Sequence, residues 1–221
     1  MSKKMNQFSA LITLVTVFFF WGFIAASNGV FIPFCKDYFD LNQFQSQLID
    51  SAFYGAYYVG GFFLFMYSSY NKKDLINNWG YKKSIIYGLL ISVFGALLMI
   101  PAINIGSFEL ILLALFILAS GFCLQQTSAN PFTISLGPKE TGSHRLNFAG
   151  GVNSLGTTIG PIVLSLLLFG GIHNTKTDIS NINLLYLFVA LLFILIAIFL
   201  YYSKHLPNTV KNSQVANTPK T

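Results

Sequence analysis

The chain has 221 residues, of which 54% are hydrophobic and 9% are charged. Because about a quarter of the residues of a soluble globular protein are charged, this composition excludes an ordinary soluble domain and indicates an integral membrane protein. The net charge of +6 comes from basic residues scattered through the loops, without the interleaved aromatic side chains that bind single-stranded nucleic acid. We therefore expect a lipid bilayer around the chain and no nucleic-acid partner.

Six segments are apolar over about 20 residues, the length that one helix needs to cross a bilayer. In chain order these spans lie at about 9–34, 45–69, 84–103, 108–135, 146–171 and 182–203. The sequence therefore predicts an all-α fold, with a bundle of six transmembrane helices over residues 1–203 and a cytoplasmic tail over residues 204–221.

The first apolar segment has a competing interpretation, because it follows Lys3 and Lys4 and contains Ala25, Ala26 and Ser27. A signal peptide has these features too, but its apolar core is about 7–15 residues long. The run here is longer and five more spans follow it, so we favour a membrane span.

The basic residues predict how the bundle lies in the membrane. Six spans place both termini on one side, together with Lys3, Lys4, Lys72, Lys73, Lys82, Lys83, Lys139, Arg145, Lys204, Lys211 and Lys220. The other side has Lys36 and Lys176. Since cytoplasmic loops are enriched in lysine and arginine, we expect a multi-pass protein of the inner cell membrane with both termini in the cytoplasm.

The fourth span contains an unusual run of polar side chains. Its members are uncharged amides and hydroxyls, namely Gln125, Gln126, Thr127, Ser128 and Asn130, and Pro131 follows them. Such groups are costly in hydrocarbon unless they face a partner, a cavity or a ligand. The run therefore predicts the wall of a polar solute pathway, in a helix that the proline ends.

Spans 1 and 4 follow a similar plan. Span 1 turns polar at Ala26-Ser27-Asn28-Gly29 before Pro33-Phe34, and span 4 turns polar at 125–130 before Pro131-Phe132. Because the two spans run in opposite directions, their polar clusters lie toward opposite faces of the membrane. This arrangement predicts an inverted repeat of three helices and three helices.

Span 5 has a face of small and polar residues, with Gly150, Asn153, Thr157 and Pro161 at helical spacing. Small residues let transmembrane helices pack closely, which is the simpler interpretation for the glycine. An asparagine at this position either lines a cavity or forms a hydrogen bond to a neighbouring helix.

Span 2 contains an ionisable residue, Asp50, about six residues from its expected outer end, and Tyr54, Tyr57 or Tyr58, and Gly61 follow on nearly the same helix face. The aspartate is either a proton-binding carboxylate of the cavity or an interfacial residue in contact with outer water.

The reactive side chains do not form a catalytic pattern. Cys35 and Cys123 lie in or beside spans and are too few for a disulfide framework. His144, His173 and His205 fall in separate loops or in the tail, without the spacing of metal ligands. We expect no enzymatic activity, metal or cofactor.

Several motifs together resemble the fucose/galactose/glucose–proton symporter group of the major facilitator superfamily. They are FQSQLIDSAFY at 44–54, TSANPF at 127–132, LGP at 136–138 and RLN at 145–147. That family has 12 spans in two six-helix bundles around a central cavity. The resemblance implies that this chain is similar to the amino-terminal bundle, with its tail at the start of the central linker.

The resemblance also implies a function, namely the transport of a monosaccharide by alternating access between this bundle and a second one. Proton or sodium is the implied coupling ion, and Asp50 the candidate coupling residue. The implied sugar contacts are amides and aromatic rings near the middle of the bilayer, namely Asn28, Gln125, Gln126, Asn130, Asn153, Tyr54 and Tyr58.

Three positions depart from the fucose symporters. Where those proteins have acidic residues in spans 1 and 4, this chain has Gly29 and Gln126, and Gly150 stands in place of a span-5 glutamine. The two acids serve proton coupling and sugar contact in the family, so their loss puts fucose-type coupling in doubt. Gln126 still has an amide that donates to and accepts from sugar hydroxyls.

The segment 70–83 occupies the place of the superfamily's cytoplasmic gating motif. Gly80, Lys82 and Lys83 fit that motif, its acidic position is Asn77 here, and Arg145 is assigned to the same gate. Lysines in such a loop pair with helix ends, or they simply anchor the loop on the positive-inside face.

Two other functional hypotheses are open. A decayed half-transporter or an assembly factor has the same fold signals but no transport activity. A transporter formed by an antiparallel dimer of this chain is disfavoured, because the biased basic residues fix a single orientation.

Overall fold

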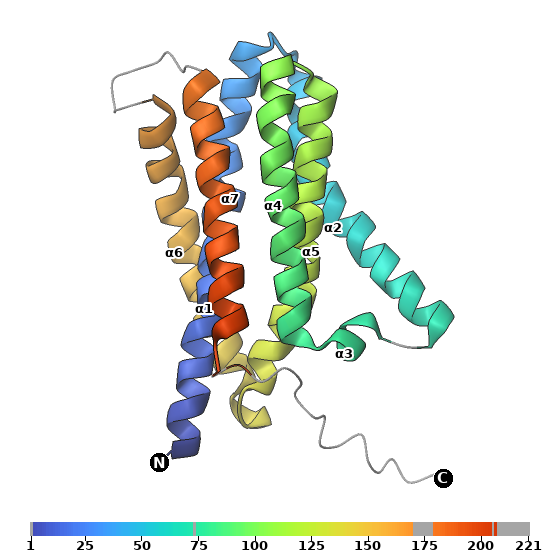
Figure 1. Ribbon diagram of the computed structural model, residues 1–221, viewed down its shortest axis with the longest axis vertical. Helices are drawn as coiled ribbons and strands as arrows, with labels where there is room; N and C mark the ends of the chain where they lie inside the picture. The colour runs from blue at the N-terminus through green and yellow to red at the C-terminus, as the bar shows by residue number, and fades with distance from the viewer. Residues whose placement is uncertain (1, 73, 170–178, 205, 207–221) are drawn as a thin grey trace.

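The computed structural model describes residues 2–72, 74–169, 179–204 and 206, without the side chains of 2–6, 27, 28, 168, 169, 179 and 181 (Figure 1). Its elements are α1 (Ser2–Tyr38), α2 (Gln43–Asn71), α3 (Leu75–Trp79), α4 (Tyr81–Ile105), α5 (Phe108–Ser135), the 3-10 turn η1 (Lys139–Thr141), α6 (Gly142–Phe169) and α7 (Ile179–Tyr202). Within these residues, six helices are long and apolar enough to cross a membrane. This finding confirms the prediction of an all-α, six-span bundle.

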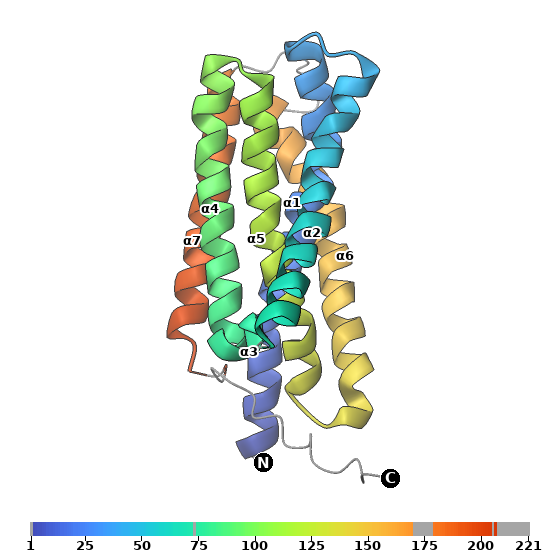
Figure 2. The same cartoon turned by 90° about the vertical axis from the view of Figure 1, so that its right-hand side faces the viewer.

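The connections alternate between the two ends of the bundle (Figures 1 and 2). The start of α1, the short helix α3, the turn η1 and the end of α7 lie at one end, and the α1–α2 and α4–α5 turns lie at the other. The end with α3 and η1 holds Lys72, Lys82, Lys83, Lys139 and Arg145. Lys36 lies at the opposite end, whereas Lys176 and the predicted tail, except 204 and 206, lie outside the described residues.

Side chains and a glycine fix the two turns at the end that contains Lys36. The Asn42 side-chain oxygen accepts from the Gln45 backbone N–H at 2.9 Å, and the Gln45 side chain accepts from the Asn42 N–H at 3.0 Å. This capping box satisfies N–H groups that the first turn of α2 leaves free. The turn after α4 uses Gly106, whose φ of +74° suits a residue without a side chain.

The prolines do not end their helices. Pro33 lies inside α1, which continues to Tyr38, and Pro131 lies inside α5, which continues to Ser135. The expectation that Pro131 ends its helix is therefore wrong, and Pro33 likewise does not end α1. A proline removes a single backbone hydrogen bond, and neighbouring helices allow a transmembrane helix to continue past that defect.

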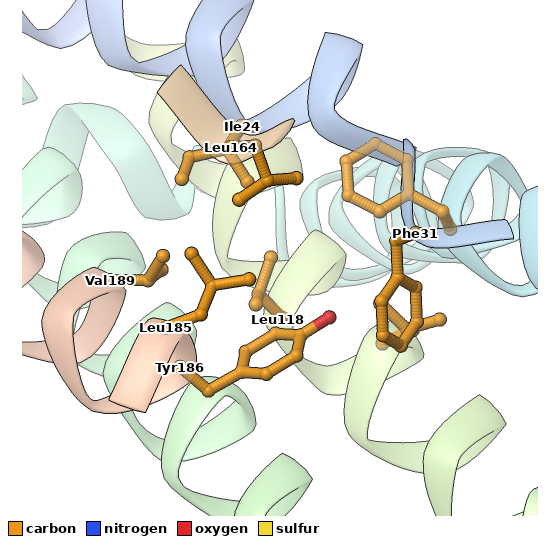
Figure 3. A pocket seen from close by; sticks show the side chains of 9 residues that line it. Ile24, Phe31, Leu118, Leu164, Leu185, Tyr186 and Val189 are labelled. Atoms are coloured by element: carbon orange, nitrogen blue, oxygen red, sulfur yellow. The ribbon is translucent and has the colours of Figure 1, made fainter. Parts of the chain in front are cut away.

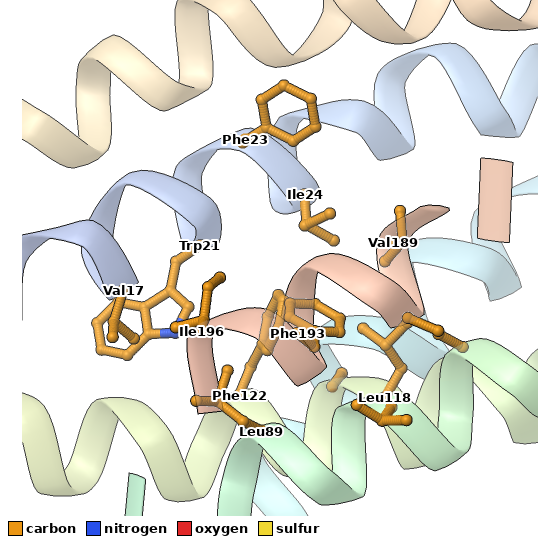
Figure 4. Packing of buried hydrophobic residues seen from close by; sticks show 14 of the residues in the cluster. Val17, Trp21, Phe23, Ile24, Leu89, Leu118, Phe122, Val189, Phe193 and Ile196 are labelled. Atoms are coloured by element: carbon orange, nitrogen blue, oxygen red, sulfur yellow. The ribbon is translucent and has the colours of Figure 1, made fainter. Parts of the chain in front are cut away.

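The buried core takes side chains from α1, α2, α4, α5 and α7, and aromatic rings of α2, α5 and α7 meet in it edge to face. The Phe122 ring of α5 lies 6.0 Å from that of Phe53 in α2 and 5.6 Å from that of Phe193 in α7. Leu89 of α4 and Leu118 of α5 are buried in the same cluster (Figure 4). Such offset and perpendicular ring pairs are the favoured arrangements of aromatic side chains.

The helix pairs follow the inverted repeat in part. If α1, α2 and α4 correspond to α5, α6 and α7, then the α1–α6 pair corresponds to α2–α5, and both pairs pack extensively. The α4–α5 pair also packs extensively, but its counterpart α7–α1 makes little contact. The repeat therefore describes the order of the helices better than it describes their packing.

A small apolar void lies between α1 and α7. Its volume is about 30 Å³, and its walls come from five helices (Figure 3). Ile24 and Phe31 of α1 face Leu185 and Val189 of α7 across it, and the Tyr186 side chain extends into the same space.

Candidate functional site

A concave site lies between α1, α2, α5 and α6. It has a volume of about 550 Å³, which is inside the range of about 300–1,000 Å³ of small-molecule sites. The lining residues are Trp21, Gly22, Ala25, Ala26, Tyr54, Tyr57, Gln126, Asn153 and Thr157. We call this space the central cavity.

The polar side of the central cavity is built on a pair from α2 and α5. The Gln126 side-chain amide donates to the Tyr57 hydroxyl at 3.4 Å. The amide oxygen of Gln126 and the hydroxyl hydrogen of Tyr57 then provide an acceptor and a donor at the same wall. Tyr54 lies one turn before Tyr57, with the two ring centroids 6.4 Å apart, and its side chain is exposed.

The opposite wall comes from Asn153 of α6. Its side-chain amide donates to the backbone carbonyl of Phe18 at 2.9 Å, and its own backbone carbonyl accepts from the Thr157 hydroxyl at 3.1 Å. The helices cross closely at Gly22, where an added Cβ would lie 2.8 Å from the Thr157 hydroxyl. Asn153 therefore holds α6 against α1 and lines the cavity with the same side chain.

The central cavity has uncharged walls. No Asp, Glu, Lys or Arg is among its lining residues. Asp50 lies one turn before Tyr54 in α2 and is partly buried, but it is not one of these residues. Neutral hydrogen-bonding groups and aromatic faces suit a polar solute without charge.

The structure places the residues of the predicted polar wall on different sides of α5. Gln126 lines the cavity, whereas the neighbouring Gln125 is fully buried among the helices and bonded to Trp21 and Ser92. Ser128 is also fully buried, and Thr127 bonds back to the Cys123 carbonyl. Because consecutive helix positions differ by about 100°, the four consecutive polar residues 125–128 cannot all face a single cavity.

The other predicted contacts are placed less closely around the cavity. Asn130 lies one turn beyond Gln126 and is partly buried, without being among the lining residues. Tyr58 is 76% exposed and stacks on Phe62, away from the cavity that Tyr57 lines. The Asn28 side chain lies outside the described residues.

Sequence reasoning did not assign Trp21, Gly22 or Tyr57 to the site. Trp21 and Gly22 lie in an aromatic stretch of the first span that is indistinguishable from a packing surface. Tyr57 and Tyr58 both have a helical spacing from Tyr54 that allows a shared face. For Tyr57, the signal that was available is its spacing of three residues from Tyr54.

The segment 70–83 is a capped helical turn rather than a plain loop. Asp74 caps α3 by accepting from the Ile76 N–H at 2.9 Å and from the Asn77 side-chain amide at 2.9 Å. Gly80 joins α3 to α4 with a φ of +84°. Lys82 donates to the backbone carbonyls of Tyr201 at 3.2 Å and Ser203 at 2.8 Å, so it caps the end of α7.

Arg145 occupies an equivalent place at the end of α5. Its guanidinium donates to the backbone carbonyls of Thr133 at 3.0 Å and Pro138 at 2.9 Å, and to that of Ile134. It also donates to the Thr141 hydroxyl at 2.7 Å. A cation at the carboxyl end of a helix satisfies carbonyls that the helix leaves free, and its charge interacts favourably with the helix dipole. Lys83, by contrast, is exposed.

Six membrane-spanning helices, four of which line an uncharged cavity, define a multi-pass membrane protein with the architecture of a solute transporter. The model of the Major Facilitator Superfamily matches residues 10–220, so the chain belongs to this superfamily.

The relatives are sugar transporters. The chain is 36% identical over 199 residues to a glucose/galactose transporter of Brucella abortus biovar 1 (strain 9-941), covering 89% of this chain and 46% of that protein. It is 33% identical over 168 residues to the L-fucose-proton symporter of Escherichia coli (strain K12), covering 76% of this chain and 36% of that protein.

The fold matches a solved transporter. The crystal structure of the Major Facilitator Superfamily transporter FucP in the outward conformation has a TM-score of 0.73 and 29% identity, over 90% of this chain and 50% of that one. The chain therefore spans about half the length of the relatives that it matches, and its bundle is one half of the major facilitator fold. These matches confirm the resemblance that the sequence motifs indicate.

Proposed function

We propose that this bundle forms one wall of a monosaccharide pathway, of the glucose, galactose or fucose class, that works by alternating access. The observation that carries the proposal is the uncharged central cavity, in which Gln126, Tyr57 and Asn153 surround about 550 Å³. A sugar needs donors and acceptors for its hydroxyls and an apolar surface for its ring face. The two amides and the tyrosine hydroxyl supply the former, and the exposed Tyr54 ring supplies the latter.

The proposal includes a second six-helix bundle on the open side of the cavity. In the most apolar stretch of each span, 17% of the residues are buried in α2 and in α6, against 44% to 61% in the other four. An added Cβ at Gly61 of α2 or Gly150 of α6 would meet nothing within 4 Å. Small residues on an uncovered face favour close packing of another helix.

We place this assembly in the inner cell membrane, with the start of α1 and the end of α7 in the cytoplasm. The support is the gathering of Lys72, Lys82, Lys83 and Arg145 at one end of the bundle, as the positive-inside rule requires. Asn28 and Asn130 extend the proposed sugar contacts along α1 and α5.

The test is uptake of radiolabelled D-glucose, D-galactose and L-fucose by membrane vesicles. Vesicles from cells that express the gene at its native locus should show saturable uptake of at least one sugar, and vesicles from a deletion strain should not. Vesicles in which this chain is the sole added protein should remain at background. Saturable uptake by the chain alone would refute the second bundle, and equal uptake by native and deletion vesicles would refute sugar transport.

Coupling is tested separately at Asp50. The cavity walls have no carboxylate, so Asp50, one turn from Tyr54, is the proposed proton site of this bundle. We expect Asp50→Asn to abolish accumulation driven by a pH gradient while sugar exchange at equal concentrations persists. Gln47→Glu, one turn earlier on the exposed surface of α2, is the matched control and should accumulate sugar normally. Full accumulation by Asp50→Asn would exclude this role.

A further inference from the structure

A chain of buried hydrogen bonds runs from the central cavity into the interior of the bundle. The Trp21 indole N–H donates to the Gln125 side-chain oxygen at 2.9 Å, and the Gln125 amide donates to the Ser92 hydroxyl at 3.1 Å. The Ser92 hydroxyl in turn donates to the Leu118 backbone carbonyl at 2.9 Å. These bonds join α1, α5 and α4 at the level of the cavity.

Every polar atom of the Gln125 amide takes part in this chain. Gln125 and Ser92 are fully buried and Trp21 is 3% exposed, so water does not compete for these bonds. A buried amide is costly when it is unpartnered and specific when it is satisfied. This series of hydrogen bonds therefore selects one orientation of the indole. An apolar contact of the same shape would not do so.

The side chain of Gln125 has little freedom to move because α4 and α5 are in close contact at glycines. An added Cβ at Gly88 would lie 2.6 Å from the Gln125 Cγ atom and 2.6 Å from the Gly121 carbonyl oxygen. The stem of Gln125 thus lies directly on the backbone of α4. Close packing of this kind leaves no room for another side-chain conformation.

Trp21 connects the rigid side chain of Gln125 to the cavity wall. Its side chain lines the central cavity beside Gly22, and Gln126, the residue after Gln125, lines the wall next to it. The indole extends from α1 toward Gln125 of α5 and belongs to the same buried cluster as Val17 and Ile196 (Figure 4). Since α1 packs mainly on α6, the bond to Gln125 ties this wall of the cavity to the α4–α5 pair.

We propose that Gln125 is a positioning residue for sugar binding: it fixes the Trp21 indole in the cavity wall through the bond between its side-chain oxygen and the indole N–H, without touching the sugar. The inference rests on the proposed sugar transport and refines it. It gives the two adjacent glutamines of α5 different roles, since Gln126 is placed to contact the sugar directly.

The experiment follows the indole and the sugar separately. Trp21 and Trp79 are the two tryptophans of the chain, so Trp79→Phe leaves Trp21 as its sole indole. The hydrogen-bond marker of the indole N–H in ultraviolet resonance Raman spectra of the purified chain reports the bond to Gln125. The KM for sugar uptake is measured in vesicles from the native-locus strain with the same substitutions.

Three variants distinguish positioning from direct contact. Gln125→Met keeps the shape of the side chain but removes both hydrogen bonds, so we expect a weaker indole marker without sugar and a KM raised about tenfold, the equivalent of one buried hydrogen bond. Gln126→Met should raise KM while the marker stays unchanged. Gln125→Glu, whose protonated form keeps an acceptor for Trp21 and a donor for Ser92, should restore the marker and lower KM toward the native value.

The proposal is overturned if Gln125→Met changes the marker without changing KM, or raises KM without changing the marker. Should Gln125→Met fail to fold, Ser92→Ala removes the hydrogen bond between the Gln125 amide and the Ser92 hydroxyl. The indole marker and the KM of this variant are then compared in the same way. Absence of native sugar uptake would refute the proposed function itself. The marker in Gln125→Met would then still show whether Gln125 fixes the indole, so the two failures are distinguishable.

Discussion

The contact between α4 and α5 and the open faces of α2 and α6 both contain glycine, but the glycines do different things. At Gly88 an added Cβ would lie 2.6 Å from the Gly121 carbonyl oxygen, and at Gly95 it would lie 2.6 Å from the Leu118 Cα atom. At Gly61 and Gly150 it would meet nothing within 4 Å. In the first region glycine lets two backbones touch, whereas in the second it marks a surface that no part of the described chain covers.

The two glutamines of α5 show the same difference within a single helix. Gln125 is buried on the α4 side with its amide fully bonded, and Gln126 is on the cavity side with its amide oxygen available. Closed packing fixes the first side chain and leaves the second accessible to a solute. The closed region is therefore a rigid support for the open one.

The largest expected effect comes from a methyl group in the closed region. Gly121→Ala places a Cβ against the Ser92 hydroxyl and the Gly88 carbonyl, so the two backbones must separate. We expect the free energy of unfolding of the chain in detergent to fall by about 1–3 kcal/mol, the usual cost of overpacking. Denaturant titration followed by circular dichroism measures it.

Gly150→Ala is the matched control, because it adds the same methyl group to an open helix. Its free energy of unfolding should stay within about 0.5 kcal/mol or rise, since alanine favours helix more than glycine does. Equal losses for Gly121→Ala and Gly150→Ala would show that the two regions do not differ in packing.

The sequence predicts the number of spans because a span depends on an uninterrupted apolar stretch. The expected span 108–135 coincides with α5, and the expected span 45–69 lies two residues inside each end of α2. The prolines are poor predictors of helix ends here, since packing in the membrane overrides the local tendency of proline to break a helix. The end of α1, expected at residue 34 and found at Tyr38, therefore had to come from the structure.

The rotation of a helix about its axis is harder to predict than its limits. A change of about 100° exchanges the environments of Gln125 and Gln126, and the sequence placed both in one wall. The choice between them depends on Gly88 and Gly121, which set how α5 lies on α4. Trp21 escaped assignment because its partner Gln125 is 104 residues away.

A second prediction concerns Arg145, which joins the open helix α6 to the end of α5. Arg145→Met removes its bonds to the backbone carbonyls of Thr133 and Pro138 but keeps the apolar stem. We expect a loss of about 1–2 kcal/mol in the free energy of unfolding, because these bonds involve a charged donor and the group is partly solvated. The same titration measures it. Lys139→Met, at an exposed position of the preceding turn η1, is the control, and a loss as large as that of Arg145→Met would refute the capping role.

The smallest effect is expected at Lys82, which ties the start of α4 to the end of α7. The ammonium group bonds to two terminal carbonyls, those of Tyr201 and Ser203, and the residue is 8% exposed. Lys82→Met keeps the stem packed and removes only the cap, so the loss of stability should be local and about 1 kcal/mol. Amide hydrogen exchange should then quicken in the last turn of α7 and remain unchanged in the middle of α4 and α5. Lys83→Met removes the same charge from an exposed neighbour. If both variants quicken exchange equally, the net charge of this end of the bundle, and not the cap, holds α7 against α4.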